Sequence, residues 1–378
     1  MLSKLSSVSK SSKLHEPFLE SHESLNPYHY SYSSSFSSLH SGLIDNSELL
    51  KLWSQPMRLF RLANLMRQKS CGDEVSFVIN RNINFTDRCV GSCSFCAFKQ
   101  EKGYKLSGEA ILNRVAEAEH MGATEICLQG GLDPLMVLED YCEILELIGQ
   151  SYPRMHLHAY SPMEVFHMSR KSCVPVEDAL IELKKSGLGS MPGTAAEILV
   201  DSVRRQICPE KLSTGEWCHV ISAAHRLGIP TTSTMLYGHI ESLVDRLRHF
   251  QVLRDIQDRT HGFTEFVLLP FMPGNNQLGP LARTMDVFDH LKTHAMARVA
   301  LYPKITNIQA SWTKLGRSVA GAALEWGVND LGGTLMEENI SRSAGSKEAQ
   351  YISHEELRGI IEMHGRNAVQ RTTLYDRL

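Results

Sequence analysis

The sequence predicts an α/β fold in the form of a (β/α)8 TIM-like barrel, preceded by N-terminal helices and followed by a C-terminal helix. Between residues 73 and 340, strand-length apolar runs alternate with amphipathic helical stretches, the pattern of a parallel sheet with right-handed crossovers. The alternation covers roughly 260 positions, about the length of one complete barrel. Polar and glycine-rich residues follow the expected strands, where barrel enzymes carry their chemistry. These observations indicate one barrel with one ring of functional loops.

The composition is that of an ordinary globular protein. Hydrophobic residues make up 42% of the 378 residues and charged residues 21%, enough for a large core in one barrel or in two or three smaller domains. The net charge of −3 offers no basic surface for nucleic acid, and no apolar run approaches the roughly 18 residues of a membrane span. We therefore expect neither nucleic acid nor a membrane as a partner.

The nine cysteines do not form the pattern of a disulfide framework. Their number is odd, no secretory signal precedes them, and three of them crowd into eight residues while the others are scattered. We expect a reducing, cytoplasmic location, with the crowded trio serving a purpose other than cross-linking.

The first 45 residues differ from the rest of the chain. Serine supplies about a third of them, and they show no hydrophobic periodicity, so we expect residues 1–45 to form a disordered extension. Their three lysines and many serines also allow a transit peptide, but the segment contains three glutamates and no arginine, which argues against one.

The remaining chain divides into three parts. Residues 46–72 have apolar side chains near helical spacing, interrupted by Pro56, and predict two short helices. In the barrel, 73–340, strands are expected at Val75–Asn80, Glu125–Gln129, Met155–Tyr160, Leu188–Met191, Pro230–Tyr237, Phe263–Pro270, Val299–Tyr302 and Val328–Leu331. Helices are expected at Ser107–Met121, Leu135–Gln150, Val176–Ser186, Thr214–Leu227, Ile240–Ile256 and Arg283–Ala297. The extension 341–378 predicts one helix, Ser353–Gly365, packed outside the barrel.

A cysteine triplet follows the first expected strand. Cys89, Cys93 and Cys96 are spaced CxxxCxxC, and the aromatic Phe95 precedes the third cysteine. Thiolates suit zinc or an iron–sulfur cluster. A structural zinc site needs a fourth protein ligand, and the sequence has no second CxxC pair or suitably spaced histidine pair. Three thiolates alone would leave one iron of a 4Fe-4S cube open to a non-protein ligand.

With Phe95, the triplet reads CxxxCxΦC, and the chain resembles the radical S-adenosylmethionine (SAM) superfamily. The resemblance implies one 4Fe-4S cluster held by Cys89, Cys93 and Cys96, with SAM chelated to the open iron and cleaved to a 5′-deoxyadenosyl radical. The cofactor would perform the radical chemistry while the protein binds, orients and excludes water. Two other interpretations are three ordinary thiols in a loop and an iron–sulfur electron carrier, which would need neither a complete barrel nor a SAM site.

The resemblance also suggests SAM-binding residues. Gln129, Gly130 and Gly131 end the second expected strand, where the superfamily carries a glycine-rich motif that the methionine end of SAM approaches. Glu197, after the fourth strand, matches a carboxylate that accepts hydrogen bonds from the SAM ribose. The alternatives are a tight strand–helix turn for the glycines and a carboxylate favoured by a helix dipole for Glu197.

Further segments resemble one family within the superfamily, FO synthase subunit 2 of deazaflavin biosynthesis. The segments are Val78–Thr86, Ser190–Leu199, Pro230–His239, Gly262–Phe271, Ile308–Gly316 and Asn329–Glu338. The likeness runs from about residue 50 to the C-terminus. Menaquinone-pathway enzymes, aminofutalosine synthase and dehypoxanthine futalosine cyclase, are the alternative, but the run from Ser190 to Glu197 favours the deazaflavin family.

This likeness implies the reaction and its partners. The 4-hydroxybenzyl group of L-tyrosine would be transferred to C5 of 5-amino-6-(D-ribitylamino)uracil, with release of 2-iminoacetate, methionine and 5′-deoxyadenosine. FO synthase subunit 1 would act as functional partner, and an unidentified electron donor would reduce the cluster.

Several polar residues near the expected strand ends are candidates for contacting the substrates: His156, His158, Tyr237, His239, Glu265, Gln309 and Asp330. Each alone is more often a structural polar group. Glu265 lies within an apolar strand, where a carboxylate is costly to bury without a partner. The alternation of Met155–His158 puts both of its histidines on one face. We therefore rank Glu265 and His158 highest as catalytic residues.

Overall fold

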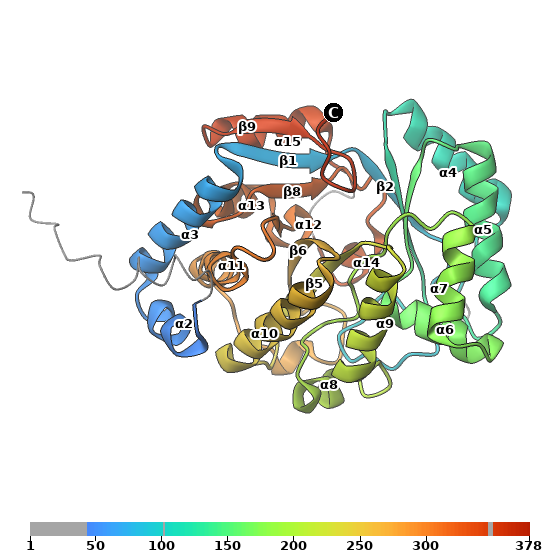
Figure 1. The fold of residues 1–378 in the computed structure, drawn as a ribbon, viewed down its shortest axis with the longest axis horizontal. Coiled ribbons are helices and arrows are strands. Elements are labelled where there is room, and N and C mark those ends of the chain that lie inside the picture. Colours follow the sequence, from blue (N-terminus) through green and yellow to red (C-terminus); the bar gives the residue numbers. More distant parts are fainter. Residues whose placement is uncertain (1–43, 101–102, 347–350) are drawn as a thin grey trace, which may run out of the picture. The chain divides into compact units, whose positions relative to one another are not determined.

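The computed structural model describes residues 44–100, 103–346 and 351–378, and these form a closed parallel barrel surrounded by helices (Figure 1). The expected extension 1–45 lies almost wholly outside the described residues. Within the described part, no helix combines the length and the apolar character that crossing a bilayer requires.

Two helices precede the barrel, as the sequence predicts. α2, Asn46–Trp53, begins at Asp45, whose side chain accepts a hydrogen bond from the Glu48 amide. α3, Pro56–Cys71, has Pro56 in its first turn, where a missing amide costs no hydrogen bond. Pro56 therefore starts the second helix, and α3 packs against α11, Val287–Leu301, on the outside of the barrel (Figure 1).

The barrel closes through eight strand positions. The first strand is divided at Ile79 into β1, Glu74–Val78, and β2, Asn80–Asn84, because β1 pairs with the last barrel strand and β2 with the second. The others are β3 Glu125–Gln129, β4 His156–Ala159, β5 Thr231–Tyr237, β6 Phe263–Pro270, β7 Ile308–Ala310 and β8 Asp330–Gly333. Every pairing between these strands is parallel. The fold is therefore the predicted (β/α)8 barrel.

The fourth strand position is only two residues long. Ser190 forms a parallel bridge to His158 of β4, and Met191 forms one to Thr231 of β5. The sequence predicts a strand at Leu188–Met191, and only these bridges remain of it. They join the three-stranded sheet β2–β3–β4 to the rest of the barrel.

Most expected helices are present, with bounds that differ by a few residues. α4 Gly108–His120, α5 Leu138–Ser151, α7 Val176–Lys185, α9 Thr214–Arg226 and α10 Leu243–Thr260 match the expected helical stretches. Shorter elements that the sequence analysis did not predict are α6 Pro162–Ser172, α8 Asp201–Ile207, η2 Gly279–Leu281, α12 Trp312–Leu315, α13 Arg317–Ala323, η3 Leu324–Trp326 and α14 Asn339–Ser343. Many helices begin at a serine that accepts a backbone hydrogen bond, such as Ser107 before α4 and Ser242 before α10.

One expected strand is wrong. The sequence predicts a strand at Val299–Tyr302, but residues up to Leu301 belong to α11. From Thr293 to Leu301 every residue of this helix is buried, because α3 covers the face that would otherwise be polar. An apolar run of this kind has no helical periodicity and reads like a buried strand. The seventh barrel strand is β7 instead.

The C-terminal extension does more than add an outer helix. The expected helix is present as α15, His354–Met363, but a ninth strand follows it, β9, Asn367–Gln370. β9 pairs in parallel with β1, on the side opposite β8 (Figure 1). The chain then turns into the barrel, so that Arg371 is buried in its interior.

Arg371 holds the N-terminal end of the barrel together. Its Nε donates to Oδ2 of Asp330 at 2.6 Å, and its Nη2 donates to Oε2 of Glu265 at 3.3 Å. The Tyr375 hydroxyl donates to the same Glu265 oxygen at 2.5 Å. One guanidinium from the C-terminal segment thus bonds to carboxyl groups on β6 and β8, which would be costly to bury unpaired.

Replacing Arg371 should destabilise the fold strongly. The substitution Arg371→Met leaves two buried carboxylates without their cation, and we expect a loss of about 3–5 kcal/mol in the free energy of unfolding, measured by chemical denaturation. Arg377→Ala is the matched control, because Arg377 pairs with Glu74 at the surface and is 72% exposed. That variant should change the free energy by about 1 kcal/mol or less. Equal effects would contradict the buried role of Arg371.

Candidate active site

A cavity of about 410 Å³ occupies the interior of the barrel. Alternate residues of each strand face it, as the two-residue repeat of a strand requires. In β3 these are Glu125, Cys127 and Gln129, and in β6 they are Glu265, Val267 and Leu269. The cavity therefore extends from the N-terminal end of the strands to the loops at their C-terminal ends.

The cysteine triplet lies at the C-terminal end of this cavity. The chain leaves β2 at Asn84 and forms an irregular loop in which the side chains of Cys89, Cys93 and Cys96 all line the cavity. All three are free thiols, and Cys96 is the most exposed. Among the described residues, no three His, Cys, Asp or Glu side chains converge on a position for a single metal ion.

Hydrogen bonds from distant segments fix the cysteine loop. The Ser94 amide and hydroxyl both donate to the carbonyl of Ile207 at 2.9 Å, and the Leu278 amide donates to the Ser94 carbonyl at 3.0 Å. At its start, the Val90 amide donates to the carbonyl of Leu132, next to the end of β3, at 3.0 Å. The Lys99 ammonium donates to the Gly91 carbonyl at 2.7 Å. The thiols are thus held by the barrel rather than by the loop alone.

A half-buried cation, Lys211, lies beside the thiols. Burial raises the pKa of Cys93, and the positive charge of Lys211 opposes that rise. Burial lowers the pKa of Lys211 itself, but Cys93 and Glu197 outweigh it, so that its pKa lies above the ordinary value. Lys211 Nζ lies 2.6 Å from Glu197 Oε1 and 5.2 Å from the centre of the Phe95 ring. A cation so placed stabilises thiolates, the form of cysteine that binds iron.

Two glycines allow close approach of the backbone to the thiols. A Cβ on Gly131 would lie 2.2 Å from the Arg88 carbonyl oxygen and 2.9 Å from Cβ of Cys89. A Cβ on Gly130 would lie 2.7 Å from the ring of Phe85. Only glycine fits at either position, and both line the cavity beside the cysteine loop. This close packing explains why glycine occurs at positions 130 and 131, which the sequence led us to expect as SAM-binding residues.

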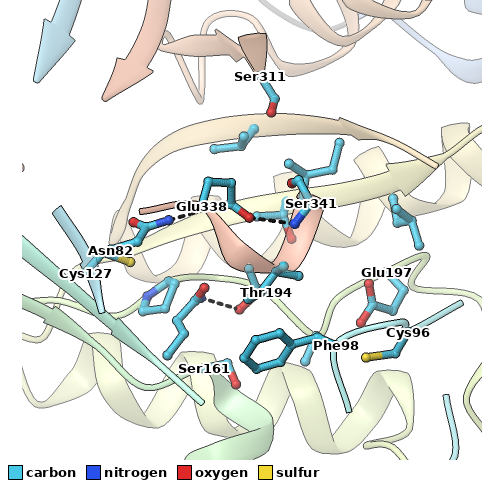
Figure 2. A pocket seen from close by; sticks show the side chains of 18 of the residues that line it. Asn82, Cys96, Phe98, Cys127, Ser161, Thr194, Glu197, Ser311, Glu338 and Ser341 are labelled. Atoms are coloured by element: carbon cyan, nitrogen blue, oxygen red, sulfur yellow. Dashed lines mark hydrogen bonds between the residues drawn. The ribbon is translucent and has the colours of Figure 1, made fainter. Parts of the chain in front are cut away.

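The other expected SAM-binding residues also line the cavity. Gln129, the last residue of β3, donates from its Nε2 to Oγ1 of Thr194 at 3.1 Å. This is the bond drawn at Thr194 in Figure 2. Glu197 is buried and has a left-handed backbone (φ 42°), an uncommon conformation for a residue other than glycine. Its carboxylate bonds to Lys211, so the interpretation of a solvent-exposed carboxylate at a helix end does not fit. Figure 2 shows Glu197, Cys96 and Phe98 together on one side of the cavity.

Glu164 also lines the cavity and was not singled out from the sequence. This residue is buried at the start of α6, where it accepts hydrogen bonds from the Ser161 amide and hydroxyl, both at 2.7 Å, and from the Gly130 amide at 3.0 Å. Burial raises its pKa to about 7, although these hydrogen bonds oppose the rise. The spacing Ser161-x-x-Glu164 is a capping box and could have revealed α6. It could not have revealed the bond to Gly130.

The two residues ranked highest as catalytic lie in the deeper part of the cavity. Glu265 is near the N-terminal end of β6, not at the loop end where the thiols lie, and is bound by Arg371 and Tyr375. Burial raises its pKa, although Arg371 opposes the rise. Burial also lowers the pKa of His158 to about 4, so this imidazole is neutral at pH 7. Both line the cavity, and their hydrogen bonds run to Arg371 and Tyr375 for Glu265 and to Ser190 for His158.

The two histidines of β4 share one partner, the Ser190 hydroxyl. His156 Nε2 and His158 Nδ1 each lie 2.7 Å from its oxygen. Of the two, only His158 faces the cavity, alongside Glu125, whose side chain accepts from Asn80 Nδ2 at 2.8 Å. Burial opposes the ionisation of Glu125, but the hydrogen bond from Asn80 and the positive charge of Arg371 favour it, and the pKa of Glu125 lies below its ordinary value.

The remaining expected substrate residues separate into two groups. Gln309 lines the cavity, whereas Tyr237, His239 and Asp330 do not. The Tyr237 hydroxyl lies 2.9 Å from Nδ1 of His290, on the helix side of β5, and Asp330 is bound by Arg371. His239 Nε2 lies 3.1 Å from the carbonyl oxygen of Leu236. Each of these three side chains therefore bonds to a neighbouring group of the protein.

The loop after β8 covers the cavity at the mouth of the barrel. Glu338 accepts hydrogen bonds from Asn82 Nδ2 at 2.7 Å and from the Ser341 amide at 2.8 Å (Figure 2). Both bonds tie the loop to β2 and to its own short helix α14. Glu338, Ser341 and Lys314, the last in α12, line the cavity and were not singled out from the sequence.

Comparison with known proteins identifies the family. The radical SAM superfamily profile matches residues 83–253, and the profile of the CofH/MqnC C-terminal region matches residues 260–377. A 5-amino-6-(D-ribitylamino)uracil–L-tyrosine 4-hydroxyphenyl transferase of Archaeoglobus fulgidus is 52% identical over 86% of this chain and 95% of its own length. The chain belongs to this radical SAM family. Its members from Methanosarcina barkeri and Methanococcoides burtonii are 52% and 51% identical, over 86% and 85% of this chain and 88% and 92% of theirs.

Two solved structures share the fold. Methylornithine synthase superposes with a TM-score of 0.70 at 16% identity, covering 86% of this chain and 94% of its own. The FeFe-hydrogenase maturase HydG of Carboxydothermus hydrogenoformans gives 0.65 at 17% identity, covering 84% and 72%. The radical SAM superfamily employs a 4Fe-4S cluster and SAM, and the donor set of this chain fits such a cluster: three free thiols, a nearby half-buried cation and a glycine, Gly131, that permits close approach to the cysteine loop.

The fit of Gly131 against the cysteine loop can be tested directly. Gly131→Ala must push the Arg88 carbonyl and Cys89 aside, and we expect a loss of about 1–3 kcal/mol in stability together with reduced iron content after anaerobic reconstitution. Gly149→Ala in α5 is the matched control, because a Cβ there meets no atom within 4 Å. The control should keep its iron and gain up to about 1 kcal/mol. Full iron content in Gly131→Ala would contradict the proposed packing.

Proposed function

We propose that this chain is the radical SAM transferase that moves the 4-hydroxybenzyl group of L-tyrosine to 5-amino-6-(D-ribitylamino)uracil, releasing 2-iminoacetate, methionine and 5′-deoxyadenosine, in deazaflavin (FO) biosynthesis. The observation that carries the proposal is one continuous cavity with three free thiols at its mouth and a polar floor, in a chain 52% identical to transferases of that name. Its volume of about 410 Å³ is in the range of small-molecule sites.

Cys89, Cys93 and Cys96 would hold one 4Fe-4S cluster per chain. The backbone of Gln129, Gly130 and Gly131 would receive the methionine part of SAM, while Glu197 would accept hydrogen bonds from its ribose and Phe95 would pack beside it. When bound, the cluster and SAM supply the one-electron chemistry that starts the reaction. An external electron donor of unidentified kind would reduce the cluster.

The protein's own contribution is to bind, orient and exclude water. At the floor, the Glu125 carboxylate accepts hydrogen bonds, and neutral His158 can donate or accept without a change of charge. These groups suit the hydroxyls of a ribityl chain and the N–H groups of a uracil. Arg371 and the C-terminal segment close the floor, and the loop carrying Glu338 covers the mouth. A radical formed inside would meet few molecules besides its partner.

Glu265 is better described as a positioning residue than as a catalytic one. Its carboxylate bonds to Arg371 and Tyr375, and these bonds hold the closing segment against the floor. His158 keeps the role of a substrate-binding residue in this proposal, because its ring faces the cavity and Ser190 fixes its orientation.

The reaction itself is the test of this function. Holoenzyme incubated anaerobically with SAM, dithionite, tyrosine and the ribitylaminouracil should form the hydroxybenzyl adduct and 5′-deoxyadenosine, detected by mass spectrometry. Cys93→Ala should form neither, whereas Cys142→Ser, a change outside the cavity, should retain activity. Consumption of a futalosine precursor without consumption of tyrosine would instead support a menaquinone-pathway enzyme.

We further propose that the chain needs a second radical SAM protein, FO synthase subunit 1, to complete the fluorescent deazaflavin. The sequence has one CxxxCxxC triplet and the described residues form one barrel, which offers one place to start radical chemistry. This protein alone should yield a non-fluorescent adduct, and fluorescence should appear when subunit 1 is added. Fluorescent product from this chain alone would refute the need for subunit 1.

We also propose a reducing, cytoplasmic location. All nine cysteines are free thiols, which is compatible with such a location.

A further inference from the structure

One cation lining the cavity has no partner. Lys314, in α12 directly after β7, is half-buried, and neither a hydrogen bond nor an ion pair reaches its ammonium from the residues that the structure describes. The other buried or half-buried cations of the cavity are engaged: Lys99 with the Gly91 carbonyl, Lys211 with Glu197, and Arg371 with Asp330. Burial lowers the pKa of Lys314, while Glu338 and Glu197 oppose the shift.

The segment that carries Lys314 is firmly held. Trp312 is buried and its Nε1 donates to the Gly333 carbonyl at 3.0 Å. The Ser346 hydroxyl donates to the carbonyl of Thr313 at 2.6 Å. Lys314 thus extends from a fixed turn at the C-terminal end of the barrel, the end that also carries the cysteine loop. A fixed, unpaired ammonium that faces a cavity is suited to bind an anionic group of a ligand.

A carboxylate at the same mouth complements this cation. Glu338 is held by Asn82 and by the Ser341 amide, and no cation lies within 4 Å of it among the described residues. Lys314 and Glu338 sense each other's charge, yet they form no ion pair. The two opposite charges are therefore held apart across the mouth. A ligand whose own positive and negative groups are adjacent would satisfy both, and an α-amino acid has such a head group.

We propose that Lys314 and Glu338 bind the head group of an α-amino acid, with its carboxylate on Lys314 and its amino group on Glu338, and that this amino acid is the tyrosine substrate. The inference rests on the proposed function. Of the three small molecules in that reaction, the ribitylaminouracil has no carboxylate, whereas tyrosine and the methionine part of SAM both have this head group. The methionine part of SAM is assigned to Gln129–Gly131 and the cluster, which leaves tyrosine for the charge pair. The two residues would therefore set specificity for the intact amino acid.

Binding of tyrosine and of two analogues tests the assignment. Holoenzyme with SAM is titrated anaerobically by calorimetry with tyrosine, with tyramine, which lacks the carboxylate, and with 3-(4-hydroxyphenyl)propanoate, which lacks the amine. Lys314→Met should weaken tyrosine binding by roughly 10- to 100-fold, the range for loss of a charged hydrogen bond, and leave tyramine binding unchanged. Glu338→Gln should weaken tyrosine binding and leave the propanoate unchanged. Lys314→Arg, which keeps the charge, should retain most of the affinity.

Controls separate a loss of tyrosine binding from a loss of SAM binding or of folding. Lys51→Met, at an exposed lysine of α2, should bind all three ligands as the wild type does. SAM affinity and thermal stability, measured on each variant, should stay near the wild-type values. A loss of SAM affinity in Lys314→Met would assign the charge pair to SAM and overturn the proposal, as would equal losses for tyrosine and tyramine. Unchanged tyrosine binding in Lys314→Met overturns this inference alone. A wild-type holoenzyme that neither binds nor consumes tyrosine overturns the proposed function as well.

Discussion

The architecture depends on placing a positive charge inside the barrel. Glu265 and Asp330 are both buried at the N-terminal end of the barrel, and Arg371 is the cation that offsets the cost of burying them. That cation comes from the last eight residues of the chain, which reach the floor because β9 pairs with β1. The depth of the cavity, and the exclusion of water from its lower end, therefore depend on a strand that belongs to no barrel position.

At the opposite end, the site is governed by close packing rather than by charge. Gly131 and Gly130 let the end of β3 approach Arg88 and Phe85, and Phe85 packs edge-on against the rings of Tyr141 and Tyr160. The cysteine loop packs against Gly131. It is also held by the hydrogen bond from the Ser94 hydroxyl to the carbonyl of Ile207 in α8. Lys211 then supplies positive charge to the thiols. Close packing of the backbone positions the thiols, and the charge of Lys211 opposes the rise in the pKa of Cys93 that burial causes.

The sequence predicted those parts of the fold whose signal is local. Strands such as Phe263–Pro270, the split helix at Pro56 and the cysteine triplet are short-range patterns, and each is present in the structure. β9 was not predicted because a strand of four residues is too short to show an alternation of apolar and polar side chains. Its partner β1 lies nearly 300 residues away in the sequence. Arg371 was missed because its partners Asp330 and Glu265 lie 41 and 106 residues away in the sequence. Glu164, Lys314 and Glu338 were missed because their surroundings, not their neighbours in sequence, make them unusual. Glu265 was singled out because burying a carboxylate is costly, and the structure does bury it. Its hydrogen-bond partners are Arg371 and Tyr375 from the C-terminal segment.

The position of β1 between β8 and β9 has a consequence for how the chain folds. β1, the first half of the first barrel strand, pairs with β8 on one side and with β9 on the other. Neither of these strand partners of β1 exists until about 330 residues have been synthesised. Contacts this distant in sequence make folding slow, because a long loop must close before they form. The barrel ring would therefore close only after β8 has been made, and its floor would stay open until β9 and Arg371 follow.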